Sequence, residues 1–281
     1  MSELKIDAHQ HFWKYSAAEY GWIDDQMSII RRDFLPSDLE TEIRNAGIGG
    51  VVSVQARQTL QETLWLLTLA AQNDFIKGVI GWAPLTEPSI RDELHLLRRD
   101  PLLRGIRHVV QDEPEGYLLR RDFSAGISVL REMGLAYDLL IHEHQLPEAI
   151  RFVDQHPHQI FVLDHLAKPR IKANRLDPWR RRIRDLARRE NVYCKISGLV
   201  TEADFKAWTK AQLQPYLETV LEAFGPTRLM FGTDWPVCLV ACPYGRWYDF
   251  VSGFAASLSP EEQANLFGRT AARAYGIPWP G

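Results

Sequence analysis

The feature that most constrains the fold of this chain is an alternation of short, β-branched runs with stretches of helical periodicity. Such an alternation is typical of βα units built around a parallel sheet. About eight runs are strand candidates: 5–12, 49–55, 76–82, 105–110, 136–141, 160–164, 192–196 and 228–232. Eight strands close a (β/α)8 barrel, so we expect this α/β fold, a TIM barrel.

Helical stretches with recognisable boundaries accompany these runs, such as one that stops at Gly47 and one that stops before Pro157. They include 36–46, 147–155, 204–224 and 260–275. We expect the helices between strands to form the outer ring, and the last helix to follow the final strand. No Ser/Gly-rich linker or abrupt change of composition divides the chain, so residues 1–281 are expected to form a single domain.

Composition and charge exclude several classes of protein. A net charge of -3 offers no attraction to a polyanion, and the arginine-rich segment 180–189 carries an apolar stripe at helical spacing. We therefore expect no nucleic-acid partner. No apolar run approaches the roughly 20 residues of a membrane span, so no membrane partner is expected. With 3 cysteines and no export signal before the first strand, a cytoplasmic protein is expected.

The sharpest local signal is a His-x-His pair, His9 and His11, at the end of the first expected strand. Side chains alternate along a strand, so both imidazoles point to the same side and can hold one face of a metal site. Alone, such a pair is more often two hydrogen-bonded core histidines than a metal site. His165 closes the sixth run and Asp234 follows the eighth, which a barrel places beside the first. We therefore predict a site at these converging strand ends.

Three cations at or near strand ends could face a carbonyl oxygen or a carboxylate: Arg107, Lys168 and Lys195. Lys195 lies within an apolar run, where burial without a partner would cost several kcal/mol, so we predict a catalytic role for it. A strand arginine such as Arg107 should be paired or point at a ligand. We assign Arg107, its neighbour His108 and the loop residue Lys168 to substrate binding.

Six segments spread along the full length resemble the amidohydrolase superfamily, and within it the branch of sugar-lactone hydrolases. They are 6–13, 105–110, 137–141, 161–169, 191–198 and 228–238. The resemblance implies a barrel that opens a lactone ring by hydrolysis. Carried over by motif, His9 and His11 match the first-strand pair, His165 matches the catalytic histidine of the sixth strand, and Asp234 matches the aspartate that activates water.

One departure from the superfamily pattern concerns the metal. The wider superfamily often places a bridging lysine or glutamate on the fourth strand, where this chain has Arg107 and His108. We therefore expect one divalent metal, with Zn²⁺ as first candidate, at His9, His11 and Asp234. A lactone is already an activated ester, so activity need not depend on the metal. His142, after the fifth strand, is assigned to substrate binding, with a plain loop role as the alternative.

Aromatic faces and hydrogen-bonding groups are the usual partners of sugar rings. Trp13 lies two residues after His11, and Trp235 comes directly after Asp234, so we expect both tryptophans to line the pocket. Residues 13–36 make too long a connection for a routine βα turn, which indicates either a lid or binding loop or a packed surface loop. Trp22 in this loop is left without an assignment.

We expect a lactonase, a carboxylic ester hydrolase, acting on a small sugar lactone of the L-fuconolactone kind. Metal-dependent decarboxylation of an aromatic acid and hydrolysis of a pyrone or muconolactone stay open as alternatives. A dicarboxylate lactone would need an arginine cluster, and the strand-end arginines are chiefly Arg57 and Arg107. A barrel that only binds its ligand has no need of an aspartate among histidines. The sequence makes no prediction of the oligomeric state.

Overall fold

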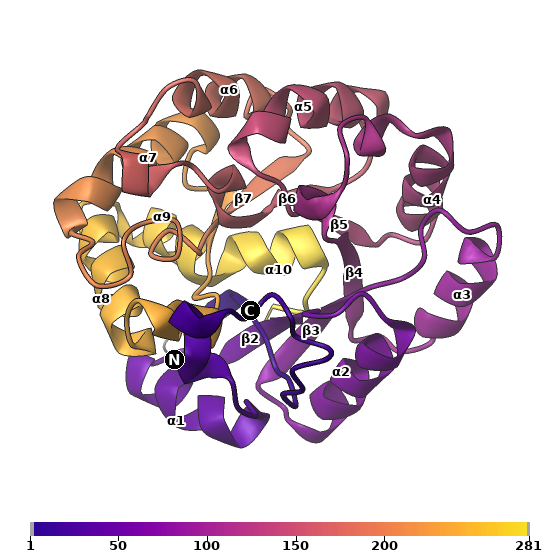
Figure 1. The fold of residues 1–281 in the computed structure, drawn as a ribbon, viewed down its shortest axis with the longest axis horizontal. Coiled ribbons are helices and arrows are strands. Elements are labelled where there is room, and N and C mark those ends of the chain that lie inside the picture. The colour runs from indigo at the N-terminus through magenta and orange to yellow at the C-terminus, as the bar shows by residue number, and fades with distance from the viewer. Residues whose placement is uncertain (1–2, 280–281) are drawn as a thin grey trace.

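Eight parallel strands in chain order form one sheet that curls into a barrel in the computed structural model, which describes residues 3–279 (Figure 1). This confirms the predicted (β/α)8 fold. The strands are β1 (Ile6–Gln10), β2 (Gly50–Val54), β3 (Ile76–Gly81), β4 (Leu103–His108), β5 (Ala136–Leu139), β6 (Phe161–Leu163), β7 (Val192–Ile196) and β8 (Leu229–Phe231). Each lies within a few residues of its predicted range, and β7 matches it at both ends.

The seam between β8 and β1 closes at the carboxyl ends of the two strands. Asp234 N–H donates to the His9 carbonyl at 2.8 Å, and His11 N–H donates to the Trp235 carbonyl at 2.7 Å. Below them the buried Asp7 carboxylate accepts from Thr233 N–H at 3.0 Å and from the Thr233 hydroxyl at 2.6 Å. The residues that close the barrel are therefore the residues that carry the predicted site.

Helices cover the sheet, and all but the last contribute to the outer layer that the sequence predicts. They are α1 (Pro36–Ala46), α2 (Leu60–Gln72), α3 (Ile90–Leu97), α4 (Arg121–Glu132), α5 (Leu146–Gln155), α6 (Trp179–Leu186), α7 (Lys210–Phe224), α8 (Tyr244–Ala255), α9 (Pro260–Ala264) and α10 (Thr270–Tyr275). The arginine-rich helix α6 buries its apolar stripe, and none of the helices within residues 3–279 has the length and apolar character needed to span a membrane.

Two predicted helices differ from the structure. Helix α7 begins at Lys210 instead of residue 204, because the Thr209 side chain accepts the Gln212 N–H as a cap while Asp204 holds a separate turn. The stretch 260–275 divides into α9, a π-helical turn over Asn265–Arg269, and α10.

The last helix, α10, crosses the centre of the barrel in the view of Figure 1 instead of joining the ring. Its residues pack against the inward side chains of the strands, which form one apolar cluster that includes Ile6, Val52, Ile80, Val162 and Met230. Arg104, near the start of β4, donates to the Gly276 carbonyl at 2.8 Å, so α10 closes the amino-terminal end of the barrel. Gly268, in the π-helical turn before α10, lets this turn approach the backbone of Leu4, since a Cβ at Gly268 would lie 2.4 Å from the Leu4 carbonyl oxygen.

Candidate active site

Three imidazoles and one carboxylate converge at the carboxyl end of the barrel. His9 Nε2 lies 3.1 Å from His11 Nε2. Asp234 Oδ1 lies 3.7 Å from His9 Nε2, 3.3 Å from His11 Nε2 and 3.9 Å from His165 Nε2. The structure thus brings together the four residues that the sequence places at the ends of β1, β6 and β8.

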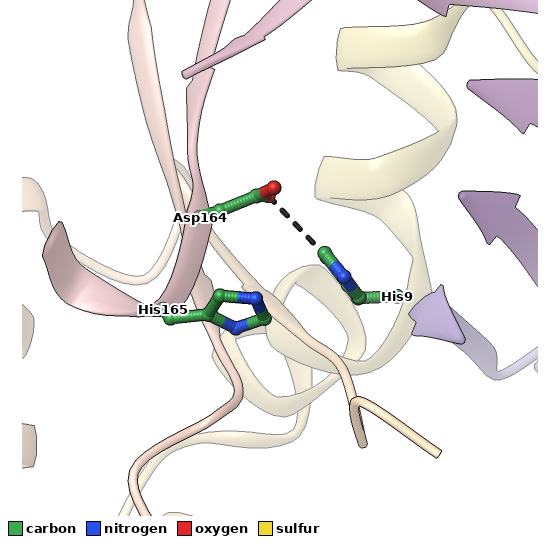
Figure 2. Close-up of side chains that lie close together, drawn as sticks. All are labelled: His9, Asp164 and His165. Carbon is green, nitrogen blue, oxygen red and sulfur yellow. Dashed lines mark ion pairs between the residues drawn. The ribbon is translucent and has the colours of Figure 1, made fainter. Parts of the chain in front are cut away.

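Each imidazole is held from behind through its other ring nitrogen. His11 Nδ1–H donates to the Val54 carbonyl at 2.8 Å, and His165 Nδ1 lies 2.9 Å from Ser197 Oγ. His9 Nδ1 lies 3.3 Å from Asp164 Oδ1. Figure 2 shows Asp164 and His165, neighbours at the end of β6, facing His9 across the barrel. Partners at Nδ1 fix the three rings with their Nε2 atoms facing Asp234.

The backbone that presents these side chains is left-handed at several residues. His165 has φ 51° and Asp234 has φ 60°, conformations that non-glycine residues seldom adopt. Gly198 makes room for the first of them, because a Cβ at Gly198 would lie 2.5 Å from His165 Nδ1. Gly232 does the same beside His9, where a Cβ would lie 2.8 Å from the His9 Cβ. The small residues after β7 and β8 therefore let the imidazoles approach the seam.

A layer of buried charge lies directly beneath the imidazoles. Lys195 Nζ lies 3.0 Å from Asp164 Oδ1 and also pairs with Asp138, and Arg107 Nη1 donates to Asp164 Oδ2 at 3.0 Å. The hydroxyl of Tyr275, on α10, donates to Asp138 Oδ1 at 2.9 Å. These charges are buried but paired, as burial requires. The predicted catalytic Lys195 is therefore placed below the site, 3.2 Å from His9 Nδ1, and does not reach the cavity wall.

Burial and the neighbouring charges set the protonation states of the site. Burial and the Lys195 ammonium hold the pKa of His9 well below its ordinary value, and burial lowers the pKa of His165 to about 4. Burial opposes ionisation of Asp234, but His165 and His11 outweigh it and lower its pKa. Burial also opposes ionisation of Asp164, whose pKa Lys195 and His9 hold well below the usual range. At neutral pH His9 and His165 are neutral and both carboxylates are ionised.

These residues form two groups that could hold a metal ion: His9 with His11 and Asp234, and His9 with Asp164 and His165. A tetrahedral Zn²⁺ with bonds of roughly 2.0–2.2 Å separates its ligand atoms by roughly 3.3–3.6 Å. The first group matches this spacing, with separations of 3.1, 3.3 and 3.7 Å. The second already holds the Lys195 ammonium, 3.0 Å from Asp164, which disfavours a second cation by repulsion. The donor set therefore fits one divalent ion.

A cavity of about 460 Å³ opens above the cluster. Its wall consists of His11, Glu19, Trp22, Ala56, Arg57, Gln58, Thr59, Arg107, Val109, Gln111, Asp112, Leu140, His165, Lys168, Asp234 and Val237. Of the residues predicted to bind substrate, Arg107 and Lys168 lie on this wall. The size of the cavity suits a small-molecule ligand.

The predicted pocket tryptophans lie behind the wall. Trp13 is fully buried against Tyr20 and Phe34, and its Nε1–H donates to the Arg32 carbonyl at 2.8 Å. Trp235 is also buried, packed edge-on against Phe34. Both residues follow site residues in sequence, but they lie beyond the ends of β1 and β8, where strand alternation no longer sets side-chain direction, and both rings pack against Phe34. Trp22, with 45% of its surface exposed, lines the cavity, so the 13–36 connection contributes to the cavity wall.

The two other histidines assigned to substrate binding also lie off the cavity wall. His108 accepts from Trp82 Nε1–H at 3.3 Å, pairs with Glu113 at 2.7 Å and stacks on Tyr117. These partners engage both ring nitrogens. His142 is half-buried and its ring stacks on that of His144. Neither belongs to a group of possible metal ligands among the described residues.

Sequence reasoning missed several polar residues of the wall: Glu19, Gln58, Thr59, Gln111 and Asp112. They come from the loops after β1, β2 and β4, where no periodicity marks a side chain as inward. The buried Glu62 is a further omission, since it accepts from Ala56 N–H at 2.9 Å and from Arg57 N–H at 2.6 Å and so shapes the β2 loop. A glutamate three residues after Thr59 was the available signal, but it marks only a helix start.

Comparison with known proteins agrees with this site. Residues 6–277 match the amidohydrolase family. The chain belongs to this family. It is 40% identical to an L-fucono-1,5-lactonase of Burkholderia multivorans over 100% of this chain and 98% of that protein. It is 34% identical to an L-fucono-1,5-lactonase of Burkholderia ambifaria over 99% of this chain and 97% of that protein. A zinc-bound amidohydrolase from Burkholderia multivorans superimposes with a TM-score of 0.95 at 40% identity, covering 98% of this chain and 100% of that one.

Proposed function

We propose that this amidohydrolase hydrolyses a sugar-acid lactone, of the L-fuconolactone kind, to the open-chain aldonic acid. The observation that carries the proposal is the Asp234 carboxylate at the floor of the cavity, with three imidazole nitrogens within 3.9 Å of its Oδ1. Full-length similarity of 40% and 34% to two L-fucono-1,5-lactonases supports the same substrate class. The substrate is a small molecule, and the proposal involves no nucleic acid and no membrane.

In the proposed mechanism Asp234 acts as the general base. Its carboxylate is ionised at neutral pH and accepts a proton from the water that attacks the lactone carbonyl. Lys168 and Arg107, on the same wall, stabilise the negative charge that develops on the carbonyl oxygen. The ring C–O bond then breaks, and the protonated Asp234 returns its proton to the leaving alkoxide. One water is consumed, and a hydroxy acid is released.

The other site residues support this step from behind. His9, neutral and paired with Asp164, and His11, held by Val54, form the rigid floor of the site beside the Asp234 carboxylate. His165 lies 3.9 Å from Asp234 Oδ1 and, as a neutral imidazole, can hydrogen-bond the attacking water or the lactone. Lys195 acts through Asp164 and His9 and is proposed as a positioning residue.

A divalent metal, Zn²⁺ first, is proposed at His9, His11 and Asp234. When bound there, such an ion supplies Lewis acidity that polarises a carbonyl and lowers the pKa of water. A lactone is already activated, so we propose that the metal is not essential. Elemental analysis is expected to find one ion per chain, lost in His11→Ala. Absence of metal from the wild type purified without chelator would contradict the site.

We propose a cytoplasmic location and a single catalytic domain over residues 1–281. The three free cysteines, Cys194, Cys238 and Cys242, are buried without disulfide partners, which suits a reducing compartment. Burial raises the pKa of the Cys194 thiol well above its ordinary value, so the thiol is unreactive.

The test is a screen of pentonic, hexonic and deoxyhexonic lactones with a pH indicator, because hydrolysis releases acid whichever sugar is present. Acid release in proportion to enzyme, without CO₂, supports the proposal. Release of CO₂ from an aromatic acid, with no turnover of any sugar lactone, would replace it by the decarboxylase alternative. Asp25→Asn is a suitable control variant, because the Asp25 side chain is 96% exposed and away from the cavity.

A further inference from the structure

Three cations line the cavity, and their partners differ. Arg107 pairs with Asp164 at 3.0 Å. Arg57 pairs with Glu19, in the 13–36 connection, and its Nε lies 3.6 Å from Glu62. Within residues 3–279, Lys168 lies in no ion pair. Two of the three positive charges on the wall are therefore already compensated by carboxylates of the protein.

The neutralised Arg57 is held firmly in its place. Glu62 accepts the Arg57 N–H at 2.6 Å, and the Arg57 guanidinium lies over the Tyr20 ring at 5.7 Å. Burial raises the pKa of Glu62 to about 7, so Glu62 is only partly ionised at neutral pH. The permanent counter-ion of Arg57 is thus Glu19, whose carboxylate lies on the cavity wall with 48% of its side chain exposed.

The balance of charge determines which rings the cavity can accept. Among the described residues Lys168 is the wall cation with no carboxylate at ion-pair distance, which suits the single carboxylate that lactone opening creates. A second carboxylate on the ring would meet the carboxylates of Glu19, Asp112 and Asp234 on the wall, and the other two wall cations are already paired. Hydroxyl groups, in contrast, can donate to those carboxylates and accept from Gln58, Thr59 or Gln111. The wall is built for a neutral, hydroxylated ring.

We propose that Glu19 is a specificity-determining residue, which neutralises Arg57 and so excludes lactones that carry a ring carboxylate while admitting their hydroxylated analogues. The proposal rests on the proposed lactonase function. In this proposal the Glu19 carboxylate repels a ring carboxylate of the wrong substrate and accepts hydrogen bonds from the hydroxyl groups of the right one. Removing the Glu19 charge should convert Arg57 into a carboxylate-binding group.

The test compares two lactones with the same ring, a hexonolactone and the aldaric acid monolactone, in which a carboxylate replaces the terminal CH₂OH. In Glu19→Gln the ratio of kcat/KM for the aldaric lactone to kcat/KM for the hexonolactone is expected to rise roughly tenfold, the value of one charge-assisted hydrogen bond. The double variant Glu19→Gln with Arg57→Met should lose this gain. Asp25→Asn, which removes an exposed charge from the same loop, should leave the ratio unchanged.

Binding of the ring-opened acids provides a readout that does not need turnover. The calorimetric Kd ratio of aldarate to aldonate should shift in Glu19→Gln in the same direction and return in the double variant. An unchanged ratio in a folded Glu19→Gln, or an equal rise in Asp25→Asn, overturns the proposal. If the wild type hydrolyses no sugar lactone, the proposed function fails, and the Kd ratios still decide the role of Glu19.

Discussion

The two ends of the barrel are built from the same strands, yet one is a core and the other a reaction site. On β7 the inward side chains run from Tyr193, in the apolar cluster under α10, to Lys195 and then Ser197, which contacts His165. On β5 they run from Ala136 to Asp138. The position of an inward residue along its strand, more than which strand it belongs to, therefore determines its role. Inward residues pack in the core at one end, carry paired charge in the middle and face the ligand at the other end.

The charged layer between the two ends connects them. Tyr275 on α10 donates to Asp138, Asp138 pairs with Lys195, and Lys195 pairs with Asp164 behind His9. The apolar end gains stability by burying area, whereas this layer is stable only while each charge keeps its partner. Substitutions at the two ends and in the layer should therefore differ in size and in kind.

The largest effect on stability is expected in the layer. Lys195→Met removes the cation that pairs with Asp138 and Asp164, leaving two buried carboxylates to repel each other. The free energy of unfolding should fall by roughly 3–5 kcal/mol, the usual cost of breaking a buried ion pair. Urea denaturation followed by circular dichroism measures it. A loss below about 1 kcal/mol would show that the layer does not depend on its pairing.

A smaller, pH-dependent effect is expected at the cavity end. Burial raises the pKa of Glu62 from 4.5 to about 7 in the folded state. A raised pKa means that the folded state binds the proton more tightly, so this contribution to stability is complete below pH 4.5 and is lost as pH rises through about 7. Relative to Glu62→Gln, which does not titrate there, the wild type should lose up to about 3 kcal/mol between these limits. A pH-independent difference between the two proteins would contradict the assignment.

Trp22 should affect substrate binding without affecting the core. Its ring is exposed at the cavity, whereas Trp13 behind it is fully buried. Trp22→Ala should reduce kcat/KM for the lactone roughly tenfold, mainly through KM, with an unchanged Tm. Steady-state kinetics and a thermal melt are sufficient. Unaltered kinetics would show that the sugar ring contacts another part of the cavity wall instead of Trp22.

The smallest effect is expected where α10 meets the charged layer. Tyr275→Phe keeps the apolar ring in its cluster and removes only the hydrogen bond to Asp138. A loss of about 1 kcal/mol in the free energy of unfolding is expected. A loss as large as that of Lys195→Met would mean that the hydroxyl, not the ion pair, holds the layer together.

The sequence was sufficient for the fold and for the four residues at the site. Strand and helix periods reveal local structure, and barrel closure then places His9, His11, His165 and Asp234 together. The orientation of α10 was not predictable, because the contact from Tyr275 to Asp138 joins residues 137 positions apart. The pairing register of β1 shifts between Asp7 and Gln10, so alternation alone could not show which of its neighbours face inward. Lys195 was predicted to be catalytic, but its buried partners, Asp138 and Asp164, come from other strands and could not be inferred from the sequence around Lys195.

The most direct test of the account is the effect of Asp234→Asn on hydrolysis of the best lactone found in the screen. The substitution keeps the size of the side chain and removes the base. We predict a fall in kcat of roughly 10²- to 10⁴-fold, the usual contribution of a general base, with thermal unfolding close to that of the wild type and full activity in Asp25→Asn. A folded Asp234→Asn enzyme with wild-type kcat would contradict the claim that the strand-end cluster is the hydrolytic site.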